Sequence, residues 1–580
     1  MLKLAKYLKA YQKQVILGPI FKMIEAIFEL IVPLVMVNII DIGIGNLDTN
    51  YILKQGGLLI LLGVVGLASS LTCQFFSSRA SQGTGTIIRR ELFKHINTLS
   101  HAEIDEVGTP SLIVRLNNDI NQVQLSVAMF IRLAFRVPVL VLGATIMAVK
   151  LDAKLSVIFL AAAIIISIIL YVIMSKSVPF YSKVQRILDK VSLIVRENLA
   201  GVRVIRAFSR QEYEKKRFED TNELLRETVI RVSRLSALLN PFTSAVTNIS
   251  IIAIIWFGGI RVDNGNLTQG EVIALCNYMM QILLALIVLA NLVVIFTKAW
   301  ASAMRINEIF DTKATVTDIG NEMQKEDKSA AHIVFRNVDF KYKGNEENFF
   351  EKVNFEILRG ETIGIIGGTG SGKSTLVQLI PRFYDCISGS IEVDGIDVKK
   401  YPFSQLREKI GMVPQQAVLF SGTIRENMKW RNSKATDEDI EIALKTAQAS
   451  EFVSKLDVGL NHMILQGGKN LSGGQRQRLT IARALIGSPE ILILDDSASA
   501  LDYTTDAKLR KAIKEDTENM TVIMISQRAN VIKDADKILV IDDGSIVGIG
   551  THDNLFKNCE VYHEICLSQL SENEIKEVGK

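Results

Sequence analysis

The chain has 580 residues, a mean hydropathy of +0.24 and a formal net charge of +4. This length is several times that of a typical domain, so at least two domains are expected. Hydrophobic residues make up 48% of the chain and its 38 glycines and 10 prolines follow no short period, which excludes a disordered or collagen-like protein. The near-neutral total conceals a division, because residues 1–310 sum to +11 and residues 311–580 to −7. A basic half is therefore joined to an acidic half.

The cysteines and the first residues exclude two further features. The five cysteines form no CxxC pair and have no histidine at zinc-ligand spacing, which argues against a disulfide scaffold or a zinc site. The N-terminal residues MLKLAKYLKAYQK lack the apolar core and cleavage site of a signal peptide. Their pattern predicts an amphipathic basic helix at an anionic cytoplasmic membrane surface.

Six apolar stretches precede residue 300, at 15–40, 55–78, 124–149, 155–175, 235–260 and 272–297. Four carry no charge, and all reach the roughly 20 residues that cross a bilayer as a helix. The loops 79–123 and 176–234 are long and rich in Lys and Arg, which places them and both termini in the cytoplasm. Much of the +11 charge then reports membrane orientation, and nucleic-acid binding is not needed to explain it.

The two long cytoplasmic loops are patterned as helices and should extend the spans well below the membrane. Each is expected to reverse at a short turn, near residues 108–110 and 208–210. These turns are candidates for contact with the soluble half.

Polar residues within the first and last spans allow two interpretations. Lys22, Glu25 and Glu29 share one helix face and either pair internally or form an acidic site for a cationic substrate. In the last span, Asn277, Gln281 and Asn291 lie within an arc of about 80°, with Tyr278 expected to add aromatic surface nearby. That polar side either forms hydrogen bonds between helices or lines a substrate path.

After about residue 311 the pattern changes to short strands alternating with helices, which predicts an α/β domain over 333–580 behind a polar linker at 311–332. The strand-like 362–366 runs into the motif GxxxxGKS and a helix, the setting of a phosphate-binding P-loop. Backbone N–H groups of such a loop surround phosphates, the lysine reaches the β/γ-phosphates and the serine ligates Mg²⁺. The expected nucleotide-binding residues here are Gly367, Gly368, Thr369, Gly370, Ser371, Gly372, Lys373, Ser374 and Thr375.

A second apolar strand, 491–494, ends in Asp495 and Asp496. A carboxylate at this position suits Mg²⁺ coordination, so Asp495 and Ser374 are expected to hold the ion.

Between these motifs, Leu471-Ser472-Gly473-Gly474-Gln475 opens a helix, and here the sequence resembles the ATP-binding cassette (ABC) transporters. Tyr342 matches their adenine-stacking aromatic residue, and residues 499–502 match the loop that communicates across the dimer. Gln415 matches the glutamine that senses the γ-phosphate, and the resemblance implies that it ligates Mg²⁺ together with Ser374 and Asp495. The resemblance covers essentially the whole chain and implies a six-span exporter half joined to a P-loop cassette. It also implies head-to-tail dimers in which each ATP lies between one chain's P-loop and the other chain's Ser472, Gly473, Gly474 and Gln475.

The sequence departs from the family pattern at the catalytic positions. Asp496 stands where the family has glutamate, so its carboxylate would fall about 1–1.5 Å short of the attacking water. Gln527 stands where the family has a cationic histidine, and Gln466 where related exporters usually have glutamate. These changes predict the degenerate-site subunit of a heterodimeric multidrug exporter in the plasma membrane, with a non-identical partner that carries the Glu and the His.

The expected substrate is a small amphipathic compound. The alternatives are a lipid, peptide or haem exporter with the same ATP-driven mechanism, and a regulatory ATP-binding subunit of such a complex.

Overall fold

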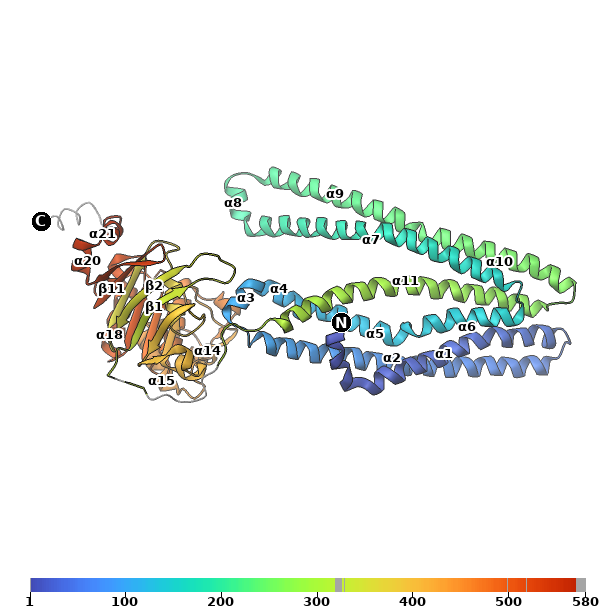
Figure 1. Ribbon diagram of the computed structural model, residues 1–580, viewed down its shortest axis with the longest axis horizontal. Coiled ribbons are helices and arrows are strands. Elements are labelled where there is room, and N and C mark those ends of the chain that lie inside the picture. Colours follow the sequence, from blue (N-terminus) through green and yellow to red (C-terminus); the bar gives the residue numbers. More distant parts are fainter. Residues whose placement is uncertain (1, 319–325, 328, 498, 518, 570–580) are drawn as a thin grey trace. The chain divides into compact units, whose positions relative to one another are not determined.

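The computed structural model describes residues 2–318, 326–327, 329–497, 499–517 and 519–569 (Figure 1). Residues 319–325 and 328 of the predicted linker lie outside the described residues, as do 570–580 of the predicted α/β domain. The chain divides into two compact units. The membrane unit comprises Met1–Asn97 and Pro110–Asp311, and the nucleotide unit comprises Thr98–Thr109 and Thr312–Lys580.

Six helical segments that are long and apolar enough to cross a membrane build the membrane unit. They cover Lys3–Ile44, Thr49–Ile96, Thr109–Leu151, Ser156–Ala200, Gln211–Asp263 and Gln269–Asp311. The prediction of six spans is therefore confirmed. Each segment is 42 to 53 residues long, more than twice what a bilayer requires, so the helices continue far beyond the apolar stretches.

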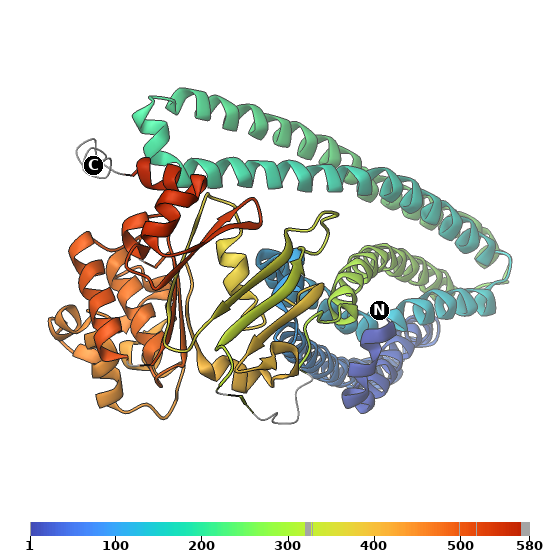
Figure 2. The same cartoon turned by 60° about the vertical axis from the view of Figure 1, so that its left-hand side comes forward.

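The helices of this unit, in chain order, are η1 (Leu2–Tyr11), α1 (Gln12–Asn38), η2 (Ile39–Ile44), α2 (Thr49–Ile96), α4 (Thr109–Val114), η3 (Arg115–Asp119), α5 (Ile120–Met129), η4 (Phe130–Ala134), α6 (Arg136–Leu151), α7 (Ser156–Ala200), α8 (Val202–Ala207), α9 (Gln211–Ala237), α10 (Leu239–Asp263) and α11 (Gln269–Asp311). The N-terminal amphipathic helix is the 3-10 helix η1, and η2, η3 and η4 are π-helical turns. Figures 1 and 2 show α7 and α9 side by side, joined through α8. The predicted second reversal lies there, with Ser209 at a φ of 52°.

Several polar groups of the first and last spans are paired, some within one helix and some between helices. Lys22 Nζ lies 2.6 Å from a Glu25 carboxylate oxygen, and Arg136 lies 2.8 Å from Glu29. The amide of Gln281 donates to the carbonyl of Glu29 at 3.1 Å. These contacts favour internal pairing over an acidic substrate site. Tyr278 offers no aromatic surface, because its ring is fully buried and its hydroxyl donates to the Leu30 carbonyl.

The nucleotide unit contains two main sheets. The first is antiparallel, in the order β2-β1-β4-β5, and the second has the order β12-β11-β3-β10-β9-β6, in which all strands but β12 run parallel. The strands are β1 (Ile333–Phe340), β2 (Phe350–Ile357), β3 (Thr362–Gly367), β4 (Ser388–Val393), β5 (Ile396–Asp397), β6 (Ile410–Val413), β9 (Ile491–Asp495), β10 (Thr521–Ile525), β11 (Lys537–Asp542) and β12 (Ser545–Gly550), with a small pair β7 (Gly422–Thr423) and β8 (Met463–Ile464). In such a sheet, ligands bind beyond the carboxyl ends of the parallel strands.

Short helices connect these strands. They are α12 (Lys373–Gln378), η5 (Val398–Lys400), α13 (Phe403–Lys409), α14 (Ile424–Met428), α15 (Asp437–Thr446), α16 (Ser450–Ser454), η6 (Gly459–Asn461), η7 (Gln466–Gly468), α17 (Gly473–Leu485), α18 (Tyr503–Asp516), α19 (Ala529–Ile532), α20 (His552–Asn558) and α21 (Glu560–Leu567). Apolar residues of β3, β9, β10 and β11 are almost completely buried and form the centre of the core. Their continuous apolar runs are typical of parallel strands covered on both faces.

A short helix from the first cytoplasmic loop, α3 (His101–Val107), belongs to the nucleotide unit. Ser100 and Glu103 form a capping box at its start. The His101 ring stacks on Phe383 at 4.4 Å, and the Tyr384 hydroxyl donates to Asp105 at 2.7 Å. The predicted contact between this loop and the soluble half is therefore present, through a helix that the sequence did not indicate.

Candidate functional site

A pocket of about 280 Å³ lies at the carboxyl ends of β3, β9 and β10. It is lined by Tyr342, Phe349, Thr369, Gly370, Gly372, Lys373, Ser374, Thr375, Gln415, Asp495, Asp496, Ile525 and Gln527. The pocket thus brings together the predicted P-loop, the strand-end carboxylates Asp495 and Asp496, and Gln527, although these segments are far apart in the sequence.

The P-loop holds its lysine against its own backbone. Gly372 has a φ of 104° and lies against the Phe350 ring, so a side chain there would be both strained and crowded. The buried Lys373 amine donates to the carbonyls of Gly367 at 2.9 Å and Gly368 at 2.6 Å. Burial lowers the pKa of Lys373, and the nearby Asp496 and Asp495 partly offset that effect. The lysine is therefore positioned for an incoming phosphate without being neutralised by an ion pair.

Two oxygen donors lie where Mg²⁺ is expected. The Ser374 hydroxyl donates to Asp495 Oδ1 at 2.9 Å, and Asp495 is only 3% exposed. Burial raises the pKa of Asp495, an effect that the Ser374 hydrogen bond partly opposes and the neighbouring Asp496 charge reinforces. Adjacent hydroxyl and carboxylate oxygens are the ligands that Mg²⁺ prefers, so these residues fit the ion.

Asp496 begins the turn after β9. Its φ of 44° lies in the left-handed region, which aspartate tolerates better than most residues, and its N–H donates to the Ile525 carbonyl at 3.1 Å. Burial raises the pKa of the Asp496 carboxyl, while a hydrogen bond with the Gln415 side chain lowers it. Gln415 and Asp496 therefore lie close together in the wall of the pocket.

Gln527 follows β10 and is one of the residues that line the pocket. None of the six histidines of the chain lines this pocket, so no imidazole substitutes for the missing one. The pocket thus offers an amide at a position where the resemblance implied a titratable cation.

The aromatic wall of the pocket contains two rings. The Tyr342 hydroxyl is 2.7 Å from Thr375 Oγ1, and its ring meets Phe349 edge-on at 5.7 Å. Phe349 was not predicted as a site residue. The sequence shows only that Phe349 comes just before β2. Its contact with Tyr342 depends on the pairing of β1 with β2, which the sequence does not reveal.

Residues 472–475, the segment that carried the family resemblance, are not among the residues that line this pocket. Ser472 caps α17 in a capping box with Gln475, and Gly473 is exposed with open space beside its Cα. Gly474 packs near the Ala500 carbonyl of the loop at 499–502. The exposed N-terminus of a 13-residue helix favours the binding of an anion such as phosphate.

Comparisons with known proteins agree with this architecture. Residues 15–286 match the family described as ABC transporter transmembrane region, and residues 350–499 match the family described as ABC transporter. A solved bacterial Atm1-family ABC exporter with ATP bound has the same fold, with a TM-score of 0.79 at 22% identity over 97% of this chain and 99% of that one.

Relatives match over nearly their whole length. The uncharacterized ABC transporter ATP-binding protein YfiB of Bacillus subtilis is 37% identical over 98% of this chain and 99% of its own. YgaD of B. subtilis, named as a candidate multidrug export ATP-binding/permease protein, is 31% identical over 95% and 96%. The ATP-dependent lipid A-core flippase of Vibrio parahaemolyticus is 28% identical over 98% of both chains. The chain therefore belongs to the ABC transporter family, as an exporter that couples ATP to transport through a transmembrane region and a nucleotide-binding domain in one polypeptide.

Proposed function

We propose that this chain is one subunit of a heterodimeric exporter in which its own ATP site hydrolyses slowly. The observation that carries the proposal is the pairing of Asp496 and Gln527 in one pocket. Both residues depart from the family pattern at the same chemical step. A partner with glutamate and histidine at these positions would supply the efficient site.

The chemistry of the two side chains explains the expected impairment. Asp496 is one methylene shorter than glutamate, so its carboxylate reaches less far toward a water in line with the γ-phosphate. Gln527 can donate a hydrogen bond to the γ-phosphate but brings no positive charge to the transition state. When bound, Mg²⁺ would neutralise charge on the β- and γ-phosphates, with Ser374, Gln415 and Asp495 as its proposed protein ligands.

The exposed segment at the start of α17 supports a further part of the proposal, that this chain completes the ATP site of its partner. Ser472, Gly473 and Gly474 are intact and lie outside this chain's own pocket. They would therefore complete the partner's site, in the head-to-tail arrangement that the family resemblance implies. The reversal at residues 208–210 remains a predicted contact with a nucleotide unit.

Restoring the two side chains tests the proposal. The double variant Asp496→Glu/Gln527→His should raise ATP turnover of the co-purified complex by about tenfold at this site, because it restores a water-polarising carboxylate and a cationic donor. Turnover at this site would be separated from the partner's by inactivating the partner's glutamate. Full ATPase and transport activity of this chain purified alone would contradict the heterodimer.

A complementary test removes nucleotide binding. Lys373→Ala should slow transport but leave hydrolysis at the partner's site, whereas the equivalent substitution in the partner should abolish hydrolysis. Equal effects of the two substitutions would show that the two sites are equivalent and would overturn the asymmetric scheme.

We also propose that the substrate is a small amphipathic compound and that the nucleotide unit is cytoplasmic, beneath the plasma membrane. The carboxylates of the first span, Glu25 and Glu29, are paired with Lys22 and Arg136. This pairing fits a substrate that is not selected by positive charge. The multidrug name of one relative and the lipid name of another leave drugs and lipids as the two classes to compare. ATPase stimulation by a panel of drugs, lipids and peptides would separate these classes. If Glu25→Gln or Glu29→Gln lost transport of cationic compounds but kept transport of other compounds, selection would depend on charge and this part of the proposal would be wrong.

A further inference from the structure

The loop that carries Gln527 connects β10 to α19 and is short. At its start, the Ser526 N–H donates to the Ile365 carbonyl of β3 at 3.1 Å, and Ser526 is 1% exposed. The Arg528 N–H donates to Ser526 Oγ at 2.9 Å. These bonds hold the beginning of the loop, but they involve neither the carbonyl of Gln527 nor the N–H of Ala529.

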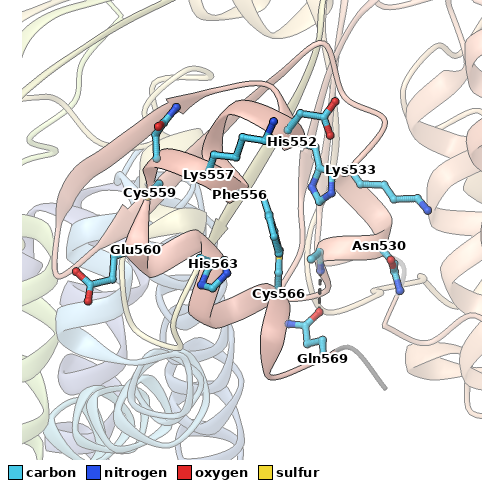
Figure 3. A pocket seen from close by; sticks show the side chains of 13 residues that line it. Asn530, Lys533, His552, Phe556, Lys557, Cys559, Glu560, His563, Cys566 and Gln569 are labelled. Atoms are coloured by element: carbon cyan, nitrogen blue, oxygen red, sulfur yellow. Dashed lines mark hydrogen bonds between the residues drawn. The ribbon is translucent and has the colours of Figure 1, made fainter. Parts of the chain in front are cut away.

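Both of those groups are held by one side chain from the far end of the described chain. Gln569 Nε2 donates to the Gln527 carbonyl at 2.7 Å, and Gln569 Oε1 accepts from the Ala529 N–H at 2.8 Å. Figure 3 shows the bond to Ala529, at the edge of a cavity of about 900 Å³ lined by α19, α20 and α21. The side-chain amide therefore spans residue 528 and fixes the loop on both sides of it, using its donor and its acceptor together.

Gln569 can act as a clamp because the helix before it is firmly anchored. Tyr562 of α21 is fully buried and Cys566 is 3% exposed, in a core shared with α19 and β11. The Tyr562 hydroxyl lies 2.8 Å from His552 Nδ1 of α20. The Gln569 N–H donates to the Cys566 carbonyl at 3.0 Å, so its backbone continues the fixed end of the helix.

From this geometry we infer that Gln569 is a positioning residue for the ATP site. It holds the backbone of Gln527, which lines the nucleotide pocket, while Gln569 itself is not among the residues that line that pocket. The inference rests on the proposed role of Gln527 at the γ-phosphate. It adds that the C-terminal helix α21 contributes to that role, through two hydrogen bonds that neither sequence motif nor spacing indicates.

The chemistry of the clamp makes specific demands on the side chain. Alanine loses both bonds. Glutamate keeps the size and the acceptor but replaces the donor with an oxygen that repels the Gln527 carbonyl, so it should also fail. Because the loop is exposed to water at this point, water can satisfy the released backbone groups, and the loss should affect position more than folding.

The test measures ATP retained by this chain within the assembled, membrane-reconstituted transporter, by photocrosslinking a radiolabelled azido-ATP after washing. We expect Gln569→Ala and Gln569→Glu each to reduce retention by about three- to tenfold, as expected for the loss of two modest hydrogen bonds, and Gln527→Ala to reduce it to a similar extent. Ser568→Ala, whose hydroxyl bonds only its own helix at Ile565, is the matched control and should retain ATP like the wild type. Melting curves of all variants should coincide within a few degrees.

A double-variant cycle distinguishes positioning from a general structural effect. If Gln569 acts through Gln527, Gln569→Ala should change retention by less than about 1.5-fold in the Gln527→Ala background. If the reductions in ATP retention caused by the two single substitutions multiply in the double variant, the inference is overturned. It is also overturned if Gln569→Glu is folded and retains ATP like the wild type while Gln527→Ala is impaired. Wild-type retention by Gln527→Ala would instead overturn the proposed role of Gln527 itself, and with it the reason for the clamp.

Discussion

The membrane unit and the nucleotide pocket treat buried charge in opposite ways. In the membrane unit, buried carboxylates have a cation beside them: Asp119 pairs with Arg305, and Asp152, 2% exposed, pairs with Arg261. In the nucleotide pocket, neither Lys373 nor Asp495 forms an ion pair within 4.0 Å among the described residues, and each is held only by neutral groups. The difference indicates that paired charges serve the fold, whereas the unpaired charges of the pocket are kept for a ligand.

A second charged cluster lies in the nucleotide unit but outside the pocket. Its charges are paired, so the unpaired charges are a property of the pocket and not of the whole unit. Asp394, 1% exposed, contacts Arg359 and Lys409, and Lys409 also reaches Glu490 at 2.9 Å. His332 lies close enough to Asp394 and Glu490 for the three to share a metal ion. The arginine and lysine already neutralise these carboxylates, so the cluster is structural and resembles the pairs of the membrane unit.

Breaking that structural cluster should have the largest effect. Asp394→Asn leaves Arg359 and Lys409 with one carboxylate fewer in a buried setting, so we expect the nucleotide unit to lose about 3 kcal/mol of unfolding free energy. Thermal melting of the purified transporter would detect this as a fall in Tm of about 6–10 °C. Glu392→Gln, which removes the carboxylate from an exposed pair with Arg336, is the control and should change Tm by little. An unchanged Tm in Asp394→Asn would contradict a structural role.

Within the membrane unit, two arginines four residues apart provide a matched comparison. Arg136→Gln should strand Glu29 and destabilise the unit by about 2 kcal/mol. Arg132 has no carboxylate within 4.0 Å among the described residues and donates to Ser77 Oγ at 3.0 Å, so Arg132→Gln should cost only about 0.5 kcal/mol. Melting of both variants in lipid nanodiscs checks the difference. Equal losses would show that pairing does not decide the role of these charges.

The charges of the pocket should behave in the opposite sense. Because burial raises the pKa of Asp495, its charged form is disfavoured in the folded unit, and Asp495→Asn should leave the nucleotide-free Tm unchanged or slightly higher. The same variant should lose about tenfold in Mg-ATP affinity, equivalent to about 1.4 kcal/mol, and with it most of the stabilisation by nucleotide. Melting curves with ATP plus EDTA and with Mg-ATP separate the two contributions. A destabilised nucleotide-free protein would assign Asp495 to the fold.

The smallest effect concerns pH. Burial alone would raise the pKa of Glu490, but hydrogen bonds from Arg359 and Lys409 hold it at about 2, below the usual 4.5. Its contribution to stability is therefore complete above about pH 4.5 and is lost as the pH falls toward 2. The side chain is 37% exposed, so solvent screens the interaction and we expect less than about 1 kcal/mol. The Tm difference between wild type and Glu490→Gln should shrink over this pH range, and a constant difference would contradict the assignment.

The sequence by itself determined the six spans, the α/β character of the second half and most of the ATP pocket. Apolar run length decides whether a helix can cross a membrane, and that length is a property of consecutive residues. The P-loop is equally local, since strand, glycine loop and helix follow one another directly between residues 362 and 378. Asp496 and Gln527 were identified through the family resemblance, and both follow parallel strands that end at one edge of the sheet, which brings them to one pocket.

Only the tertiary structure decided which distant side chains meet. The pairing of Glu29 with Arg136, the packing of α3 against Phe383 and Tyr384, and the approach of Phe349 to Tyr342 join residues from different elements. Gln569 is the clearest case, because nothing around it resembles a motif, yet it contacts the loop of Gln527 from 42 positions away. The physical reason is that hydrogen bonds and ion pairs act over a few ångströms in space, and separation along the chain does not specify that distance.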